Sequence, residues 1–321
     1  MKKISELTNF FYNELHPELK ELEKDRKILA KKLIKIGIFI SFVSFAITYS
    51  IINNSHSFSE FHLAPAVLGF GLFMWIKKYI SKDYTHEFKD AIIHPLIQQI
   101  DNSLHYSKTH HIAQRDFQGS KLFRKRIDRY NGNDLVRGKI DGVQLQFSDV
   151  HAEYESKDSK GRRSWHTIFQ GLFIVADFNK HFVGQTTILP DKAEKLFGKL
   201  IGSWLQRHNM AQESLIKMDN PTFERHFVVY GTKQIEARYI LTHAMMKRLL
   251  DFKKRSSVPL YISFVDSKIY LALEYNKDLF EPTVFSSLLE FKLIKEYIST
   301  LQLCIGIVHE LKLNEKLWSK T

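Results

Sequence analysis

The chain has 321 residues, enough for one large domain or two modest ones, and its 44% hydrophobic and 26% charged residues exclude a disordered protein. Cys304 is the only cysteine, so no intramolecular disulfide can form, which suits a reducing compartment. The net charge of +12 favours an anionic partner, either a nucleic acid or a negatively charged lipid leaflet.

The first predicted element is a helix over Ile4–Leu33, interrupted near Pro17, within a cytoplasmic segment 1–33. Leucines recur along it with Arg26 among many charges, which gives a partial apolar stripe. We expect this helix to continue into the apolar run that follows or to pack on the segment Tyr84–Leu104.

The first apolar run, Ile36–Ile52, is 17 residues long and contains no Lys, Arg, Asp or Glu. About 17–25 apolar residues cross the hydrocarbon core of a bilayer as a helix. A signal peptide is disfavoured because the run starts more than 30 residues into the chain and no small-residue cleavage site follows it. The alternative is a buried helix of a soluble protein, which would show a polar face; here the polar side chains are small hydroxyls.

A second apolar run, Phe61–Ile76, is 16 residues long and has Pro65 in its first turn. Gly69 and Gly71 would let a neighbouring helix approach closely. An aromatic and basic interface anchor follows, formed by Trp75, Lys77, Lys78 and Tyr79. We predict a second transmembrane helix, with a re-entrant or interfacial segment as the alternative.

Basic residues flank the two runs on their outer sides only: Lys31, Lys32 and Lys35 before them, and Lys77, Lys78 and Lys82 after them. Because positive residues stay inside, both termini are predicted to be cytoplasmic. The sequence therefore predicts a transmembrane helical hairpin over 34–80, with two spans.

A helical linker over 81–118 follows, with apolar residues Phe88, Ile92, Leu96 and Ile100 at a spacing of four and a kink or break at Pro95.

Strand patterns dominate the remaining segment, 119–321. Hairpins are predicted at Asp141-Gly142 and around Asp266–Lys268, with a polar loop over Ser156–Ser164. Phe169–Phe178 and Phe182–Leu189 look like an antiparallel pair that turns at Asn179-Lys180, and His226–Gly231 reads as a single strand. Strands outnumber crossover helices, so the fold class is α+β, with a cytoplasmic antiparallel-sheet domain.

Three helices accompany these strands. The first, Asp191–Arg207, has a capping-box-like pair, Asp191 and Glu194. The second, after Thr242, buries Met245, Met246, Leu249 and Leu250. The third, Val284–Leu311, lies across the sheet or, as the alternative, forms a homodimer seam along Ile294, Ile298, Leu301, Ile305 and Val308.

No phosphate-binding glycine loop, HExxH motif or GxSxG elbow is present, so no catalytic residue is assigned. His105, His110 and His111, with Gln114 and Asp116, form a weak metal pattern better explained as a solvated loop. Cys304 lies among aliphatic residues and is expected to be packed. We expect no metal and no cofactor.

Basic clusters are the clearer signal, and three are present. They are Lys121, Arg124, Lys125, Arg126 and Arg129; then Lys157, Lys160, Arg162 and Arg163; then Lys247, Arg248, Lys253, Lys254 and Arg255. We expect these clusters to face anionic lipid, with mere solvation as the alternative, and the chosen lipid-facing candidates are Lys121, Arg124, Lys125, Arg126, Arg129, Arg162 and Arg163. Nucleic acid is disfavoured because the clusters lack interleaved aromatic residues.

The stretch Pro221–Phe252 resembles a bacterial family of membrane proteins, the family of domain of unknown function 3137, through a Phe-x-Val-Tyr strand followed by Glu-Ala-Arg-Tyr-Ile-Leu-Thr. Matching pieces are GLFIVADFNKHFVGQTTILPD, SFVDSKIYLAL and DLFEP. The resemblance implies a two-span bacterial protein with a cytoplasmic domain, and no activity. It makes Glu236, Arg238 and Tyr239 family-motif candidates. Arg238 satisfies a carboxylate or carbonyls at a strand–helix junction, or alternatively binds an anion in a pocket.

These observations predict a protein of the bacterial inner membrane that acts as a binding or scaffolding module, with anionic lipids and a membrane protein as partners. The alternative is a membrane-associated enzyme acting on a lipid or nucleotide. A transport component is disfavoured because neither span carries a charged residue.

Overall fold

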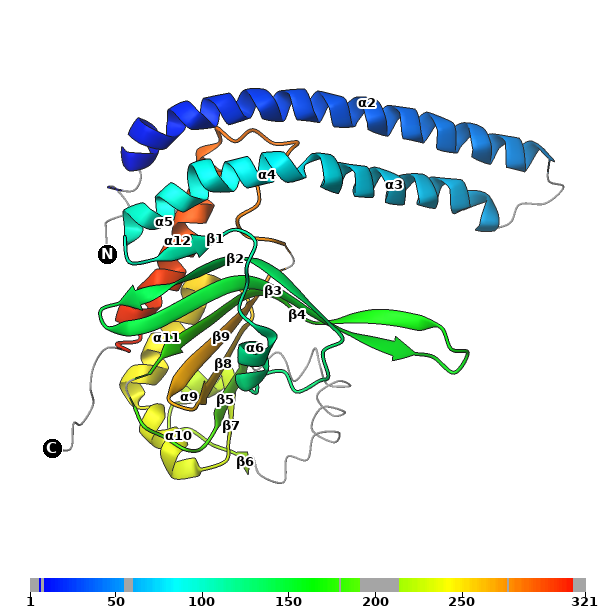
Figure 1. Ribbon diagram of the computed structural model, residues 1–321. Coiled ribbons are helices and arrows are strands. Elements are labelled where there is room, and N and C mark those ends of the chain that lie inside the picture. Colours follow the sequence, from blue (N-terminus) through cyan, green and yellow to red (C-terminus); the bar gives the residue numbers. More distant parts are fainter. Residues whose placement is uncertain are drawn as a thin grey trace. The chain divides into compact units, whose positions relative to one another are not determined.

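Figure 1 shows the protein as a computed structural model, which describes residues 6, 9–54, 60–178, 180–190, 214–275 and 277–313. The chain forms two compact units. The sheet unit comprises Ile97–Leu279 and Tyr297–Thr321, and the helical unit comprises Lys2–Leu96 and Phe280–Glu296. Each unit is therefore made of two separate stretches of the chain. Two of the boundaries, before Ile97 and before Tyr297, fall inside helices.

The helical unit contains η1 (Phe11–Leu15), α2 (His16–Asn54), η2 (Glu60–Leu63), α3 (Ala64–Ile80), α4 (Lys82–Phe88), η3 (Lys89–Ile93) and the start of α5 (His94–Ile100). The segments η1 and η3 are π-helical turns directly before Pro17 and Pro95. In each, a histidine N–H bonds back five residues, from His16 to Phe11 and from His94 to Lys89. The predicted interruptions at both prolines therefore take the form of π-turns, and α2 runs unbroken from His16 to Asn54.

The core of the helical unit lies between the first half of α2 and the segment α4–α5. The side chains of Leu19, Leu22 and Leu33 of α2 are buried, and so are those of Phe88 of α4 and Ile92 of η3. The apolar stripes predicted at these positions are thus confirmed as buried helix faces.

The segment 280–296 joins this core through a buried ion pair. The Arg26 guanidinium donates two hydrogen bonds to Glu23, at 2.8 and 2.7 Å, and a third to the Val284 carbonyl at 2.7 Å. Glu23 also accepts the Leu288 N–H at 3.0 Å. The pair fixes two points of a segment that lies about 260 residues further along the chain.

The sheet unit is built on nine strands in the order β1-β2-β3-β4-β9-β8-β5-β7-β6, and every pairing among the described residues is antiparallel. The strands are β1 (His105–Ser107), β2 (Arg129–Ile140), β3 (Val143–Lys157), β4 (Arg163–Asp177), β5 (Thr186–Pro190), β6 (Ser214–Leu215), β7 (Phe227–Gly231), β8 (Leu260–Val265) and β9 (Lys268–Glu274). The predicted α+β class with an antiparallel sheet is confirmed.

Both predicted tight hairpins are present. Asp141 and Gly142 have φ values of 45° and 84° between β2 and β3, and Asp266 and Ser267 have 50° and 57° between β8 and β9. Positive φ at both central positions is the geometry that matches the twist of antiparallel strands. Short polar residues and glycine adopt it at low cost, which explains why these two signals were reliable.

The predicted pairing of Phe169–Phe178 with Phe182–Leu189 is wrong. The first segment belongs to β4, which pairs with β3 and β9, and the second contains β5, which pairs with β7 and β8. Closeness in sequence favoured a hairpin, but the β8–β9 hairpin lies between these two strands in the sheet.

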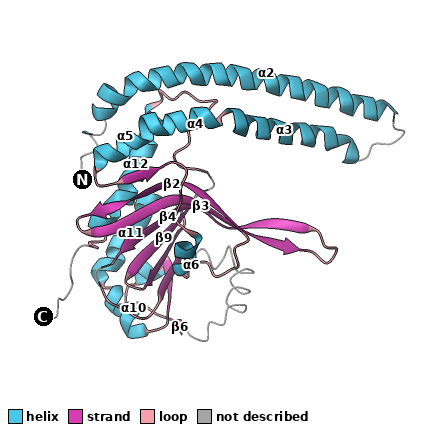
Figure 2. Ribbon diagram, in the orientation of Figure 1, coloured by secondary structure: helices cyan, strands magenta, loops and turns pink. Residues whose placement is uncertain are grey.

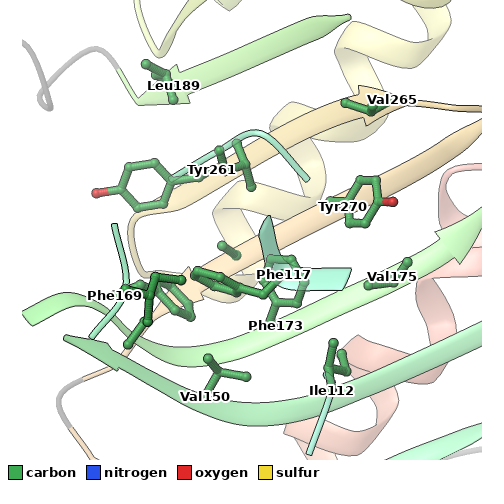
Figure 3. Close-up of a cluster of buried hydrophobic side chains, with 14 of the residues drawn as sticks. Ile112, Phe117, Val150, Phe169, Phe173, Val175, Leu189, Tyr261, Val265 and Tyr270 are labelled. Carbon is green, nitrogen blue, oxygen red and sulfur yellow. The ribbon is translucent and has the colours of Figure 1, made fainter. Parts of the chain in front are cut away.

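Helices cover both faces of the sheet, with α6 (Gln114–Gly119) over one face and α11 (His243–Ser256) over the other (Figure 1). On the α6 face, Phe117 packs against Phe173 with ring centroids 4.9 Å apart (Figure 3). It also packs against Phe123 at 5.2 Å. Tyr270 and Ala272 of β9 belong to this cluster, whereas Ile269 and Leu271 alternate with them and are buried on the opposite side.

The remaining helices are α9 (Pro221–Glu224), α10 (Gln234–Ile240) and α12 (Phe291–Glu310). The predicted Thr242 cap is present, because its hydroxyl accepts the Met245 N–H at 3.3 Å. The last helix begins seven residues after the predicted start, Val284, and its expected seam is buried within the chain at Ile298, Leu301 and Ile305. The predicted helix Asp191–Arg207 lies outside the described residues.

Candidate membrane and anion-binding surfaces

The second half of α2 and the whole of α3 expose large apolar side chains on every side except the one on which they pack together. Phe39, Phe42 and Phe45 of α2 are 68–70% exposed, and Leu68 and Phe70 of α3 are 73% and 68% exposed. None of the α3 side chains is buried. Monomeric soluble proteins rarely leave continuous apolar surface of this extent in water.

Within the described ranges, one helix, Phe11–Asn53, is long and apolar enough to cross a bilayer by length and composition. The structure thus supports one candidate span and not the predicted pair. The second apolar run forms η2 and then α3, which has only 17 residues, the lower end of lengths that cross the hydrocarbon core.

The second half of α2 and α3 lie side by side (Figure 1). A methyl group built at Gly69 would collide with the Ser44 hydroxyl and come within 3.2 Å of Ile40, whereas one at Gly71 would meet no atom within 4 Å. Gly69 therefore permits the close helix contact predicted for it, and Gly71 points into open space.

We expect Gly69→Leu to weaken the contact between α2 and α3 by about 1–3 kcal/mol, because overpacking forces the helices apart. Gly71→Leu gives the same gain in helix propensity and adds the same side-chain volume, but that volume enters open space. It therefore serves as the matched control. The measurement is disulfide crosslinking between cysteines introduced on α2 and α3 in membranes. Equal crosslinking of both variants would contradict the contact.

In the sheet unit, β3 and β4 extend past their neighbours as a two-stranded arm (Figure 2). Pairing of β3 with β2 ends at Glu153, and pairing of β4 with β9 begins only at Gly171. We define the arm as residues 153–167. Its tip is a turn in which Asp158 accepts the Arg162 N–H at 2.8 Å and its side chain N–H at 2.9 Å, and these bonds lower the pKa of Asp158. The predicted polar loop is accordingly shorter than Ser156–Ser164.

The arm brings together the first two basic clusters of the sequence. Arg129 pairs with Glu153 at 3.2 Å, and its guanidinium carbon lies 3.9 Å from the centroid of the Trp165 ring. Lys125 places its ammonium 3.2 Å from the Tyr154 ring centroid. Arg163 pairs with Glu155 at 3.4 Å, on the same face as Trp165.

The aromatic residues of the arm were missed in the sequence. Tyr154 and Trp165 lie far from the cluster Lys121–Arg129 along the chain. Only the registers of β2 against β3 and of β3 against β4 place them beside Lys125 and Arg129. Period-2 alternation with basic residues on either side of a turn is the signal that could have found them.

The third basic cluster lies elsewhere, on α11. Lys253 donates to the His226 carbonyl at 3.0 Å and lies over the Phe227 ring, and Arg255 pairs with Glu310. Burial raises the pKa of Glu310. Lys247 and Lys254 are exposed.

The family-motif candidates lie on α10, which follows β7. Glu236 accepts the Gly184 N–H at 2.6 Å and pairs with Lys233 at 3.0 Å. Arg238 donates to Asp219 at 2.8 Å and to the Lys217 carbonyl at 3.1 Å. The Tyr239 carbonyl accepts a hydrogen bond from Lys180 at 3.0 Å. These contacts tie two neighbouring segments, 180–184 and 217–219, to one short helix.

Lys180 is 4% exposed, and its ammonium also lies 4.6 Å from the Tyr239 ring centroid. Burial lowers its pKa. The Tyr239 carbonyl and ring partly replace the water that the ammonium loses.

Within the described part of the chain, no three His, Cys, Asp or Glu side chains gather as metal ligands. His110 bonds to the Ser107 hydroxyl at 2.7 Å, and His111 packs on Tyr130 with centroids 5.3 Å apart. Burial lowers the pKa of His111 and raises that of the Cys304 thiol, which is fully enclosed on α12.

Residues 167–313 match the family model described as Protein of unknown function (DUF3137). This part of the chain is a DUF3137 domain. It runs from the middle of β4 to the end of α12 and includes α10 with Glu236, Arg238 and Tyr239. The cluster Lys121–Arg129 and most of the arm precede the DUF3137 region.

No match is found among curated protein sequences. Among solved structures, the crystal structure of the mycobacterial trehalose monomycolate transport factor A, TtfA, is similar at 12% identity with a TM-score of 0.33. The match covers 67% of this chain and 93% of that chain.

Proposed function

We propose that this protein is anchored in the bacterial inner membrane by α2 and α3 and serves there as a non-enzymatic binding or scaffolding module. Both helices cross the bilayer, both termini are cytoplasmic, and the sheet unit carries the binding surfaces. Anionic lipids and a membrane protein are its partners. The observation that carries this proposal is the apolar, exposed surface of the paired helices.

Hydrocarbon is the medium that such a surface requires. Roughly 25 cal/mol is gained for each Å² of apolar surface removed from water, so a pair of helices with exposed phenylalanines and leucines favours lipid strongly. Ser44 and Thr48 are the kind of polar side chain that a spanning helix tolerates, because their hydroxyls can bond to the helix carbonyls. The close contact at Gly69 is typical of helices that pack within membranes.

The end of α3 carries an interface belt. Trp75 and Tyr79 are 66% and 73% exposed and stack with centroids 6.0 Å apart. Lys77 lies 5.4 Å from the ring centroid of Phe285, which is itself 52% exposed. Amphipathic rings beside lysines match the headgroup level of a bilayer and support α3 as the second span, with its C-terminal end on the cytoplasmic side.

We expect the full-length protein to remain with membranes after an alkaline carbonate wash. A reporter that fluoresces only in the cytoplasm, fused after Thr321, should be active, and an alkaline phosphatase fused there should be inactive. Release by carbonate would refute the anchor. An active phosphatase after Thr321 would instead refute the two-span topology and leave one span.

A scaffolding role also predicts a stable partner. Crosslinking of the full-length protein in native membranes should capture a membrane protein. If Glu236 and Arg238 serve only the structure of α10, their replacement should leave this capture intact; if they contact the partner, it should be lost.

A further inference from the structure

We propose that the β3–β4 arm is a dedicated contact for the phosphate groups of anionic membrane lipids, with Lys157 and Lys160 at its tip and the Arg129–Trp165 pair at its base. The inference rests on the proposed membrane anchor and goes beyond it by naming one element and one ligand chemistry.

The arm and the segment beside it carry an excess of positive charge. Residues 121–129 and 153–163 contain nine basic and four acidic residues. The four carboxylates are paired with Arg126, Arg129, Arg162 and Arg163. Lys121, Lys157 and Lys160 have no carboxylate partner among the described residues, and all three are exposed. Their charge is therefore available to an outside anion.

The aromatic rings distinguish between two anionic partners. A protein that binds single-stranded nucleic acid offers open aromatic faces on which bases stack. Here, Arg129 covers one face of Trp165, and Tyr154 has Lys125 on one side and stacks with His166 at 4.9 Å. The Tyr154 ring is thus already engaged by two neighbours, and Trp165 presents an amphipathic edge beside a guanidinium, which is the chemistry of a headgroup contact.

The geometry of the arm also suits a flat charged surface. It is a two-stranded ribbon with no covering strand beyond Glu153 on one side and before Gly171 on the other, so its tip can meet a surface without disturbing the sheet. The pairs Arg129–Glu153 and Arg163–Glu155 bridge neighbouring strands.

The test uses the full-length protein in vesicles of phosphatidylcholine, with or without phosphatidylglycerol in both leaflets. Cys304 is buried, so Ser159→Cys at the tip can be labelled selectively with an environment-sensitive fluorophore. We expect an emission increase of about twofold in the anionic vesicles, lost when salt shortens the Debye length to about 3 Å near 1 M. A label at Gln234→Cys, on α10, should not respond.

Charge reversal supplies the matched comparison. Lys157→Glu with Lys160→Glu should abolish the response, whereas Lys247→Glu with Lys254→Glu, an equal change of charge on α11, should leave it intact. Equal emission with and without phosphatidylglycerol, or equal loss in both double variants, would overturn the inference. A response to a single-stranded oligonucleotide in neutral vesicles would assign the arm to nucleic acid and overturn it as well. Release of the protein by carbonate would instead refute the proposed membrane anchor. Failure of the anchor and failure of the lipid contact are therefore distinguishable.

Discussion

Replacing Glu23 with Gln should destabilise the helical unit by about 3–5 kcal/mol, because it leaves the buried Arg26 charge without its counterion. Both side chains are almost fully buried, with 10% and 5% exposed for Arg26 and Glu23. An amide also replaces one of the two acceptor oxygens with an NH2 donor, so one of the two hydrogen bonds from the guanidinium is lost. The measurement is thermal unfolding of the full-length protein in detergent, with Tm lowered by at least about 6 °C.

The chain offers a matched control in the pair Glu21–Lys24. It has the same spacing of three on the same helix, but its side chains are 71% and 68% exposed. Glu21→Gln should therefore change stability by about 0.5 kcal/mol or less. If both substitutions gave the same shift in Tm, the Glu23–Arg26 pair would have no special role.

The same pair predicts an acid dependence. Hydrogen bonds from Arg26 lower the pKa of Glu23 from 4.5 to about 2 in the folded state. A lowered pKa gives stability that is fully present above the unfolded value and is lost as the pH falls from 4.5 towards 2. The difference in Tm between the wild type and Glu23→Gln should accordingly shrink across this range.

Phe117→Ala should cost about 3–5 kcal/mol in the sheet unit, because it opens a cavity at the centre of an aromatic cluster. Phe117 has no exposed surface and touches Phe169 and Phe173 (Figure 3). It also touches Phe123. Its helix, α6, has only six residues, too few to be stable without packing. The loss should appear as a lower Tm and as faster hydrogen exchange in residues 114–119.

Gln118→Ala in the same helix is the control for this second prediction. Gln118 is exposed, and alanine has a slightly higher helix propensity, so stability should change by less than about 0.5 kcal/mol. A Phe117→Ala protein that unfolds at the wild-type temperature would show that α6 is not held by this ring.

Local patterns in the sequence predicted most of the local structure. The Asp141-Gly142 and Asp266-Ser267 turns, the Thr242 cap and the stripe through Phe88 and Ile92 depend on neighbours within a few residues. The strand order does not, because β4 and β5 are neighbours in sequence and β9 and β8 separate them in the sheet. Sequence distance alone could not reveal that insertion.

The candidate surfaces, too, could be predicted only where they depend on neighbouring residues in the sequence. The apolar runs and basic clusters were visible as composition, whereas the rings of Tyr154 and Trp165 join the cations only through strand register. The contact between Arg26 and the Val284 carbonyl joins residues 258 positions apart, and no periodicity signals it.

That long-range contact constrains how the polypeptide can be made. The helical unit includes Phe280–Glu296, so it is incomplete until nearly the whole chain has left the ribosome. Under the proposed two-span anchor, the α2–α3 hairpin can enter the lipid early, but Arg26 and Glu23 must wait for Val284 and Leu288 with their charges solvated. A nascent chain stalled before Phe280 should hence be inserted yet easily cleaved by protease near Glu23, and become resistant only once synthesis passes Glu296.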